Sequence, residues 1–260
     1  MSVVLRTAGV SVSYGGVRAL RDVDLTVEEG QLVGLIGPNG AGKTTFIDAI
    51  TGFVASSGRI ELDGVEISEF APERRARSGL ARTWQSAELF DELKVRENVA
   101  VTAYRPSLVR VVREILTARA ERPAAVDRTL DLLGLRDLAG VMPESLTQGQ
   151  RKLVGVARAL APEPRLVCLD EPAAGLDSGE SEALGRHLRE IVERGQAMLL
   201  VDHDMGLVLS VCDQVVVLDF GSVIASGSPE EVRRNPRVVE AYLGKAAAAE
   251  AAGPAPAGAA

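Results

Sequence analysis

The fold is decided by the stretch Gly37-Pro38-Asn39-Gly40-Ala41-Gly42-Lys43-Thr44-Thr45, which matches the pattern G-x-x-x-x-G-K-[ST] in full. The apolar run Leu32–Ile36 before it predicts a buried strand, and Phe46–Ile50 after it predicts the first turns of a helix. Glycines let backbone N–H groups turn toward phosphate oxygens, and the helix N-terminus favours their negative charge. We therefore expect all nine residues of the stretch to cradle nucleotide phosphates. Lys43 would reach the β- and γ-phosphates, and the Thr44 hydroxyl would hold Mg²⁺.

Composition narrows the class of protein. The chain has 260 residues, 46% hydrophobic and 25% charged, an ordinary globular mix long enough for one sizeable domain or two small ones. The net charge of −7 argues against a nucleic-acid partner, because nucleic-acid binders usually show a basic face. Cys168 and Cys212 lie in apolar stretches, which favours buried reduced thiols in a cytoplasmic protein. No apolar run approaches the roughly 18 residues of a membrane span, so we expect any membrane role to go through a partner.

The chain divides into three regions that differ in expected secondary structure. Residues 3–67 are rich in strand patterns, with a hairpin signal at Asp63-Gly64, and residues 95–160 are helical in pattern, for example at Val109, Val112, Ile115 and Leu116. From Arg165 onward strands and helices alternate, which predicts parallel strands with crossover helices. The expected elements there are Leu166–Leu169, Ser181–Val192, Ala197–Val201, Met205–Val211 and Gln214–Leu218. The tail from Ala246 is Ala, Gly and Pro with one Glu, which favours disorder, although a helical extension through Ala252 is the alternative.

Acidic and imidazole side chains follow two of the expected parallel strands. Asp170 and Glu171 end the run Leu166–Leu169, where Asp170 can bind Mg²⁺ and Glu171 can polarise the attacking water. His203 follows the strand Ala197–Val201, at the ligand-binding end of a parallel sheet, and we interpret it as a sensor of the γ-phosphate. The alternative for His203 is a solvated loop imidazole.

Taken in order, these motifs resemble the ATP-binding subunits of ABC transporters, over about residues 3 to 244. The stretch Ser145-Leu146-Thr147-Gln148-Gly149-Gln150 is similar to the family signature L-S-G-G-Q. Thr147 stands for the serine and keeps a hydroxyl for the γ-phosphate, Gln148 replaces the first glycine, and Gly149 and Gln150 keep the family residues. The resemblance implies that these four residues contact an ATP molecule held by a second subunit.

Three further residues match family positions. Tyr14, before Gly15-Gly16, corresponds to the aromatic residue that stacks on adenine. Gln85 corresponds to the glutamine that joins Mg²⁺ and the γ-phosphate to the transmembrane partner. Asp177, in Gly175-Leu176-Asp177, corresponds to the loop that crosses between two ATPase subunits.

The resemblance also implies the fold. It is the α/β P-loop NTPase core of the ABC ATPase type, with an antiparallel β subdomain and a helical subdomain insertion. The ATPase domain would cover residues 1–244, the helical insertion approximately residues 86–162, and the disordered tail residues 245–260.

A narrower resemblance is to the ATPases of branched-chain amino acid importers. It rests on Gly79–Gln85 with Leu89-Phe90, on Asp170–Leu176, on His203-Asp204-Met205 and on the end from Gly227 to Gly244. Two features differ from the usual pattern of that branch: the helical insertion is short, and the signature segment has different residues. ATPases of lipopolysaccharide, lipid and urea transporters share much of the pattern and remain alternatives.

The family implies that two such subunits, identical or different, sandwich two ATP molecules with Mg²⁺ and move transmembrane permease subunits. The chain would then lie at the inner face of the cell membrane, and the assembled importer would include an extracytoplasmic solute-binding protein. A nontransport nucleotide-switched regulator is the rival from another class, but such relatives usually carry tandem domains or long coiled coils. A kinase would leave the signature segment, Asp177 and His203 unexplained.

Overall fold

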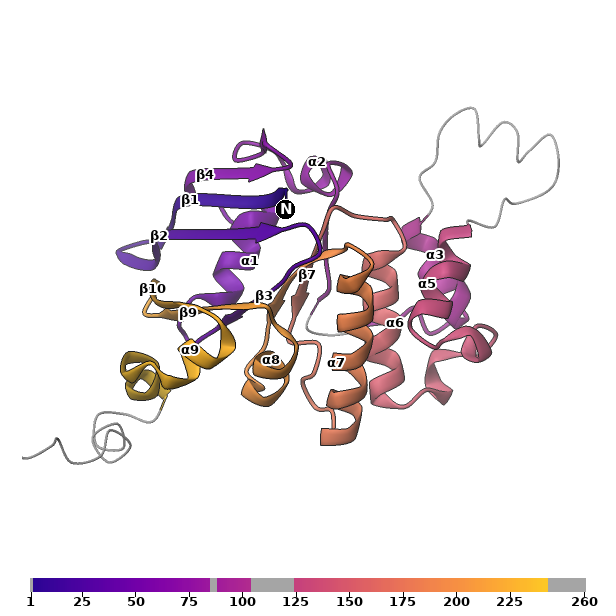
Figure 1. The fold of residues 1–260 in the computed structure, drawn as a ribbon. Coiled ribbons are helices and arrows are strands. Elements are labelled where there is room, and N and C mark those ends of the chain that lie inside the picture. Colours follow the sequence, from indigo (N-terminus) through magenta and orange to yellow (C-terminus); the bar gives the residue numbers. More distant parts are fainter. Residues whose placement is uncertain (1, 85–87, 104–123, 243–260) are drawn as a thin grey trace, which may run out of the picture.

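A six-stranded sheet forms the middle layer of the computed structural model, which describes residues 2–84, 88–103 and 124–242 (Figure 1). Its strands lie in the order β10-β9-β3-β8-β7-β6. All neighbouring pairs are parallel except β9 and β10, as the alternation of strands and helices predicted. In the same order the strands are Ser222–Gly227, Gln214–Asp219, Leu32–Ile36, Ala197–Val201, Leu166–Asp170 and Leu80–Arg82.

A second, four-stranded antiparallel sheet covers one side of the middle layer, with α1 (Lys43–Thr51) between the two sheets (Figure 1). Its strand order is β2-β1-β4-β5. Asp63 and Gly64 join the last two strands and both have positive φ, 49° and 74°, as the tightest hairpin turns require. The hairpin predicted at this position is therefore confirmed. The strands are Val17–Glu28, Val3–Tyr14, Ser57–Leu62 and Val65–Glu66.

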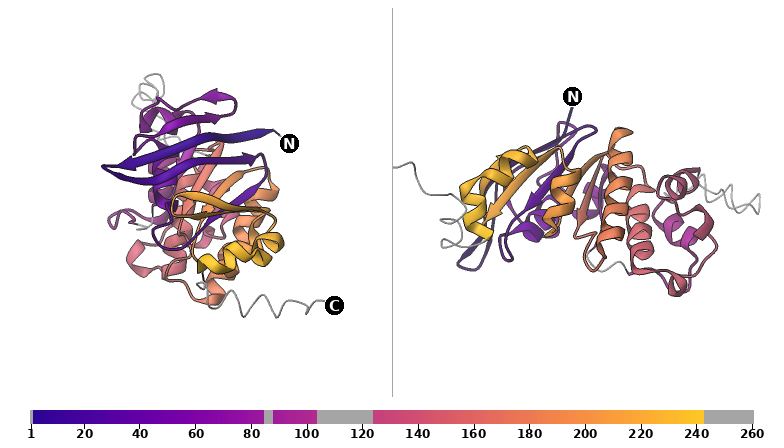
Figure 2. Two further views of the ribbon diagram at one scale, coloured as in Figure 1. Left: turned by 90° about the vertical axis from the view of Figure 1, so that its left-hand side faces the viewer. Right: turned by 60° about the horizontal axis from the view of Figure 1, so that its bottom comes forward.

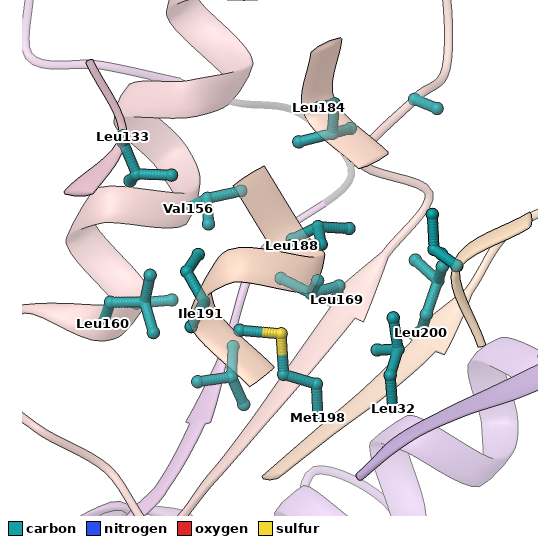
Figure 3. Close-up of a cluster of buried hydrophobic side chains, with 14 of the residues drawn as sticks. Leu32, Leu133, Val156, Leu160, Leu169, Leu184, Leu188, Ile191, Met198 and Leu200 are labelled. Atoms are coloured by element: carbon teal, nitrogen blue, oxygen red, sulfur yellow. The ribbon is translucent and has the colours of Figure 1, made fainter. Parts of the chain in front are cut away.

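Side chains of the central strands alternate between two hydrophobic clusters. On β3, Leu32 and Ile36 belong to the cluster on the helical side, whereas Val33 and Leu35 face α1 and the antiparallel sheet. Figure 3 shows the helical side, where Val156 and Leu188 lie over strand residues such as Leu169 and Met198. Every residue of β3, β7 and β8 is buried, which explains why these strands read as continuous apolar runs.

Helices cover the face of the central sheet opposite the antiparallel sheet and extend beyond its β6 end (Figure 2). Gly134, with φ of 64°, follows the end of α5 as a C-terminal glycine should. Val109, Val112, Ile115 and Leu116 lie outside the described residues, as does the tail. The described helices of this region are α3 (Val95–Ala103), α5 (Ala124–Leu132), α6 (Gln148–Leu160), α7 (Ser178–Glu193) and α8 (Met205–Val211), with single 3-10 turns at Arg136–Leu138 and Pro143–Ser145.

Short helices complete the fold. They are α2 (Pro72–Arg77), α9 (Pro229–Arg234) and a helix over residues 236–242. Both cysteines are buried and unpaired, as predicted. Within the described ranges, none of the helices has the length and apolar character of a membrane span.

Candidate nucleotide site

The carboxyl ends of four parallel strands meet at one edge of the central sheet. Leu35 of β3 and Asp170 of β7 both pair with Val201 of β8, and Arg82 of β6 pairs with Cys168 of β7. The chain leaves these ends as the phosphate loop, the Asp170-Glu171 pair, the His203 turn and the Trp84 segment. Ligands of open parallel sheets bind outside this edge, so the predicted site residues converge where the fold allows binding.

Close packing of the phosphate loop explains two of its glycines. A Cβ atom on Gly37 would lie 2.1 Å from the Leu218 carbonyl oxygen, and one on Gly42 would lie 2.7 Å from the Ala19 carbonyl oxygen. Gly42 is the N-cap of α1, with φ of 106° and no side-chain hydrogen bond to the first turn. The N–H groups that begin α1 therefore have no side-chain cap, and such a helix start is suited to bind phosphate.

Lys43 lies in the first turn of α1 and is 7% exposed. Its Nζ donates hydrogen bonds to the carbonyl oxygens of Gly37, at 2.8 Å, and Pro38, at 3.1 Å. Burial lowers the pKa of the Lys43 ammonium, and the charge of Glu171 is the largest effect that opposes this shift. An ammonium has three N–H donors, so one is left for a phosphate oxygen while the other two hold the loop.

Asp170 ends β7 as a buried carboxylate. Its Oδ2 accepts a hydrogen bond from an Arg82 guanidinium nitrogen at 2.8 Å, and its backbone N–H donates to the Thr83 hydroxyl at 3.0 Å. Burial raises the pKa of Asp170, whereas the hydrogen bond and charge of Arg82 oppose the shift. Neither Arg82 nor Thr83 was predicted as a site residue, because their contacts with Asp170 depend on the pairing of β6 with β7.

The next residue, Glu171, adopts a left-handed backbone conformation with φ of 47°, which is uncommon for a residue other than glycine. Its N–H donates to the Val201 carbonyl oxygen at 2.7 Å. The Glu171 Oε2 atom lies 4.0 Å from Nδ1 of His203. The structure therefore places the expected base and the expected γ-phosphate sensor side by side.

Asp202 holds the segments that carry these two residues. It is fully buried, and its carboxylate accepts N–H groups from Ala173 at 3.1 Å, His203 at 2.8 Å and Asp204 at 3.0 Å. The Ala173 bond fixes the chain just after Glu171, and the other two fix the turn around His203. Asp202 was not predicted as a site residue. Its place directly after the strand Ala197–Val201 could have indicated a site residue. Its burial depends on the packing of distant segments, which the local sequence does not show.

The signature segment begins α6 with a reciprocal cap. The Thr147 hydroxyl accepts the Gln150 N–H at 3.2 Å, and the Gln150 side-chain oxygen accepts the Thr147 N–H at 2.9 Å. The Thr147 hydroxyl proton is not used by this cap, which leaves it for an acceptor such as phosphate. Figures 1 and 2 show α6 and α1 separated by strands of the central sheet.

Residues 175–180 pack against the signature segment. A Cβ atom on Gly175 would lie 2.4 Å from the Gln148 side-chain nitrogen, and one on Gly149 would lie 2.8 Å from a Glu180 carboxylate oxygen. Asp177 is the N-cap of α7 and accepts the Glu180 N–H at 2.8 Å. The structure thus brings the signature residues and Asp177 into one unit within the chain.

Of the expected site residues, Tyr14 lies away from this edge and Gln85 lies outside the described ranges. Tyr14 ends β1 at the hairpin to β2 and is 51% exposed, so its ring is accessible for stacking. Gln85 falls in 85–87, outside the described residues, immediately after Trp84. The roles of Tyr14 and Gln85 remain predictions.

Comparison with known proteins agrees with this geometry. The model of the ABC transporter family matches residues 20–174, more than half of the chain. The chain belongs to the ABC transporter family. As the ATP-binding member of such a system, this ABC ATPase binds nucleotide and hydrolyses ATP. A second model, described as branched-chain amino acid ATP-binding cassette transporter, matches residues 222–248.

Individual relatives are similar over nearly their whole length. The high-affinity branched-chain amino acid transport ATP-binding protein BraF of Pseudomonas aeruginosa is 38% identical over 94% of this chain and 98% of its own. The protein LivG of Escherichia coli, with the same description, is 35% identical over the same shares. A solved nucleotide-free ATP-binding cassette of an ABC transporter has a TM-score of 0.80 at 30% identity, covering 94% of this chain and all of its own. An ADP conformation of such a cassette has a TM-score of 0.79 at 30% identity over the same shares, which confirms the fold class.

Thr147→Ala is expected to reduce ATP-driven association of this ABC ATPase strongly, because it removes the hydroxyl expected to reach the opposing γ-phosphate. Gln148→Gly is expected to change activity only modestly, since its amide packs on Gly175 within the same chain. The added backbone entropy of glycine costs about 0.5–1 kcal/mol in regular structure. Association should be measured by light scattering with ATP and the partner subunit present. If Thr147→Ala associates normally and Gln148→Gly does not, Gln148 is itself the phosphate contact.

Proposed function

We propose that this ABC ATPase powers import of branched-chain amino acids through a membrane permease, with ATP hydrolysis as its reaction. The observation that carries the proposal is the agreement of two independent parts of the chain. The edge formed by the phosphate loop, Asp170, Glu171 and His203 supports the chemistry, and the match of residues 222–248 supports the substrate class. ATPases of lipid, lipopolysaccharide or urea transporters are the alternatives, and that C-terminal match favours branched-chain amino acids over them.

The hydrolytic step assigns a separate role to each residue at the edge. The loop N–H groups and Lys43 stabilise the negative charge that develops on the transferred phosphoryl group. Glu171 accepts a proton from, or polarises, the water that attacks the γ-phosphate. His203, 4.0 Å from Glu171, contacts the γ-phosphate and keeps the two groups aligned.

Mg²⁺ fits the donor set at this edge. The Thr44 hydroxyl at the start of α1 and the buried carboxylate of Asp170 would supply oxygen ligands, and Gln85 would add an amide oxygen. Phosphate-bound Mg²⁺ commonly takes one or two protein oxygens and completes its shell with phosphates and waters. When bound, Mg²⁺ neutralises charge on the β- and γ-phosphates. The chain's contribution is to hold Asp170 in place through Arg82 and Thr83.

A second ATPase subunit, identical or different, would complete each site. α1 and α6 pack into hydrophobic clusters on opposite faces of the central sheet, so residues 147–150 are separated from the phosphate loop of the same chain. In the proposed sandwich, Thr147–Gln150 and Asp177 of one subunit close on the ATP of the other. ATP can drive closure only if it binds the closed pair better, and two bridged γ-phosphates supply that difference.

A cavity of about 1020 Å³ beside Trp84 is the proposed docking site of the permease. Phe53 and Trp84 line it, are 53% and 54% exposed, and have ring centroids 5.1 Å apart. Arg77 and Arg158 also line it, which suits an amphipathic cytoplasmic helix with an apolar face and acidic flanks. Arg82, which binds Asp170, also lines the cavity, so a docked helix would lie next to the nucleotide site. The ATPase would be peripheral at the inner membrane face, and an extracytoplasmic solute-binding protein would deliver the amino acid.

The double variant Phe53→Ala with Trp84→Ala tests this docking site. Aromatic anchors in a groove often contribute 2 kcal/mol or more, so we expect capture of the cognate permease in detergent to fall roughly tenfold or more. Val65→Ala, an exposed apolar residue on the antiparallel sheet, is the matched control and should capture normally. Nucleotide binding should persist in all variants. Normal capture by the folded double variant would exclude this cavity as the docking site.

A further inference from the structure

Arg82 is a buried cation that contacts two carboxylates and an aromatic ring. Its side chain is only 7% exposed, and its two terminal nitrogens donate separately to Asp170, at 2.8 Å, and to Asp48. The guanidinium carbon also lies 4.5 Å from the centre of the Trp84 ring, within the range of a cation–π contact. Arg82 therefore connects β7, α1 and the segment that leads to Gln85.

The geometry requires an arginine. A planar guanidinium can present one nitrogen to each carboxylate while its face rests on an indole, whereas a lysine ammonium is a point charge that cannot do all three. Among the residues that the structure describes, the buried Arg82 Nε has no hydrogen-bond partner, and the terminal nitrogens make the polar contacts of this side chain. Removing the guanidinium would leave Asp170 buried without its counter-charge, which is costly.

A continuous line of contacts runs from the nucleotide edge to the aromatic wall of the cavity. Asp170 contacts Arg82, Arg82 lies on Trp84, and the Trp84 ring packs edge-on against Phe53 at 75°. Asp48 anchors the same guanidinium to α1, the helix that begins with Lys43 at the phosphate loop. The guanidinium that lies on Trp84 thus also binds Asp170 at the nucleotide edge and Asp48 of α1.

We propose that Arg82 is a positioning residue that couples the presence of a cation near Asp170 to the contact between its guanidinium and the Trp84 ring in the cavity wall. A cation held near Asp170 competes with Arg82 for the carboxylate, and the guanidinium then interacts more strongly with the indole face. Coupling between two sites is reciprocal, so a ligand that moves Trp84 changes cation affinity at Asp170 by the same factor. The inference rests on the proposed function for the cation site at Asp170 and for what occupies the cavity.

Trp84 provides the readout, because it is the only tryptophan of the chain. The protein is saturated with a non-hydrolysable ATP analogue in EDTA, and Mg²⁺ is then added while tryptophan emission and bound analogue are both recorded. We expect a saturable change in Trp84 emission at constant bound analogue. In the wild-type protein, an emission spectrum that stays unchanged throughout the Mg²⁺ titration would overturn the coupling, and this arm needs no variant.

Arg82→Gln is expected to lose most of the emission change and to need roughly 10–100-fold more Mg²⁺ for half-saturation of hydrolysis, as changes in the partners of metal ligands typically do. Arg82→Lys keeps the charge and replaces the glutamine variant if that variant does not fold. It should give an emission change and a Mg²⁺ requirement between those of the wild type and those expected for Arg82→Gln. Arg165→Gln is the control, because Arg165 also binds an aspartate, Asp63 at 2.6 Å, but lies directly before β7, at the end of that strand opposite Asp170. A folded Arg82 variant with the wild-type emission change at wild-type Mg²⁺ would refute the proposal. Normal permease capture by the Phe53→Ala, Trp84→Ala double variant, together with an intact Trp84 response of the wild-type protein to Mg²⁺, would instead refute the docking site alone.

Discussion

Lys43→Ala is expected to abolish ATP binding or to reduce hydrolysis by roughly 100- to 1000-fold, the loss typical of removing one preorganised charge-stabilising group. The ammonium also ties the phosphate loop together through the carbonyl oxygens of Gly37 and Pro38. The substitution therefore removes both the N–H donor left for phosphate and the two hydrogen bonds that hold the loop.

The measurement is ATP binding and steady-state turnover of the purified variant, with thermal unfolding to show that it folds. Lys94→Ala, an exposed lysine before α3, is the control and should behave as wild type. Near-normal turnover of Lys43→Ala would contradict the assignment of the phosphate loop.

Glu171→Gln is expected to keep ATP binding and to lose roughly 100- to 10,000-fold in hydrolysis, the range of a general base. The amide keeps the shape of the carboxylate but is a poor proton acceptor. Because ATP would persist in the closed pair, the variant should also accumulate as an ATP-dependent dimer.

Light scattering with ATP and Mg²⁺, with the partner subunit included, measures the dimer, and phosphate release measures hydrolysis. Glu193→Gln, at the exposed end of α7, is the charge-matched control. A Glu171→Gln protein that stays monomeric and hydrolyses ATP normally would show that another group activates the water.

Local patterns were sufficient to predict the central elements. The strand Ala197–Val201 and the helix Met205–Val211 have the predicted bounds, and Leu32–Ile36 is the buried strand expected before the phosphate loop. Each is decided by short-range features: a run of apolar residues, a capping aspartate or a glycine-rich turn. The order of such elements then predicts a parallel sheet whose carboxyl ends form the site.

Contacts between distant segments could not be predicted in this way. Arg82 is 88 residues from Asp170 and 34 from Asp48; the pairing of β6 with β7 brings Arg82 to Asp170, and the packing of α1 on the sheet adds Asp48. Likewise, the carboxylate of Asp202 supports Ala173 because two adjacent strands end at the same level. From local sequence patterns alone, Arg82 and Asp202 are only charged residues next to recognised motifs.

The packing of Gln148 is a third case. The sequence indicated a bulky side chain where the family has glycine, and the structure places its amide against Gly175 of the same chain. A residue with a side chain at position 175 would collide with it. The departure at 148 is therefore accommodated by a glycine 27 residues later, which no local pattern relates to the signature.

Uptake of labelled leucine tests the central claim most directly. The ATPase, its permease and the leucine-loaded solute-binding protein are assembled in proteoliposomes with ATP on the side that carries the ATPase. We predict ATP-dependent leucine accumulation that Glu171→Gln abolishes, with no ATP-dependent movement of urea or lipid. ATP-dependent transport of urea or lipid by the same assembly, without leucine uptake, would contradict the account.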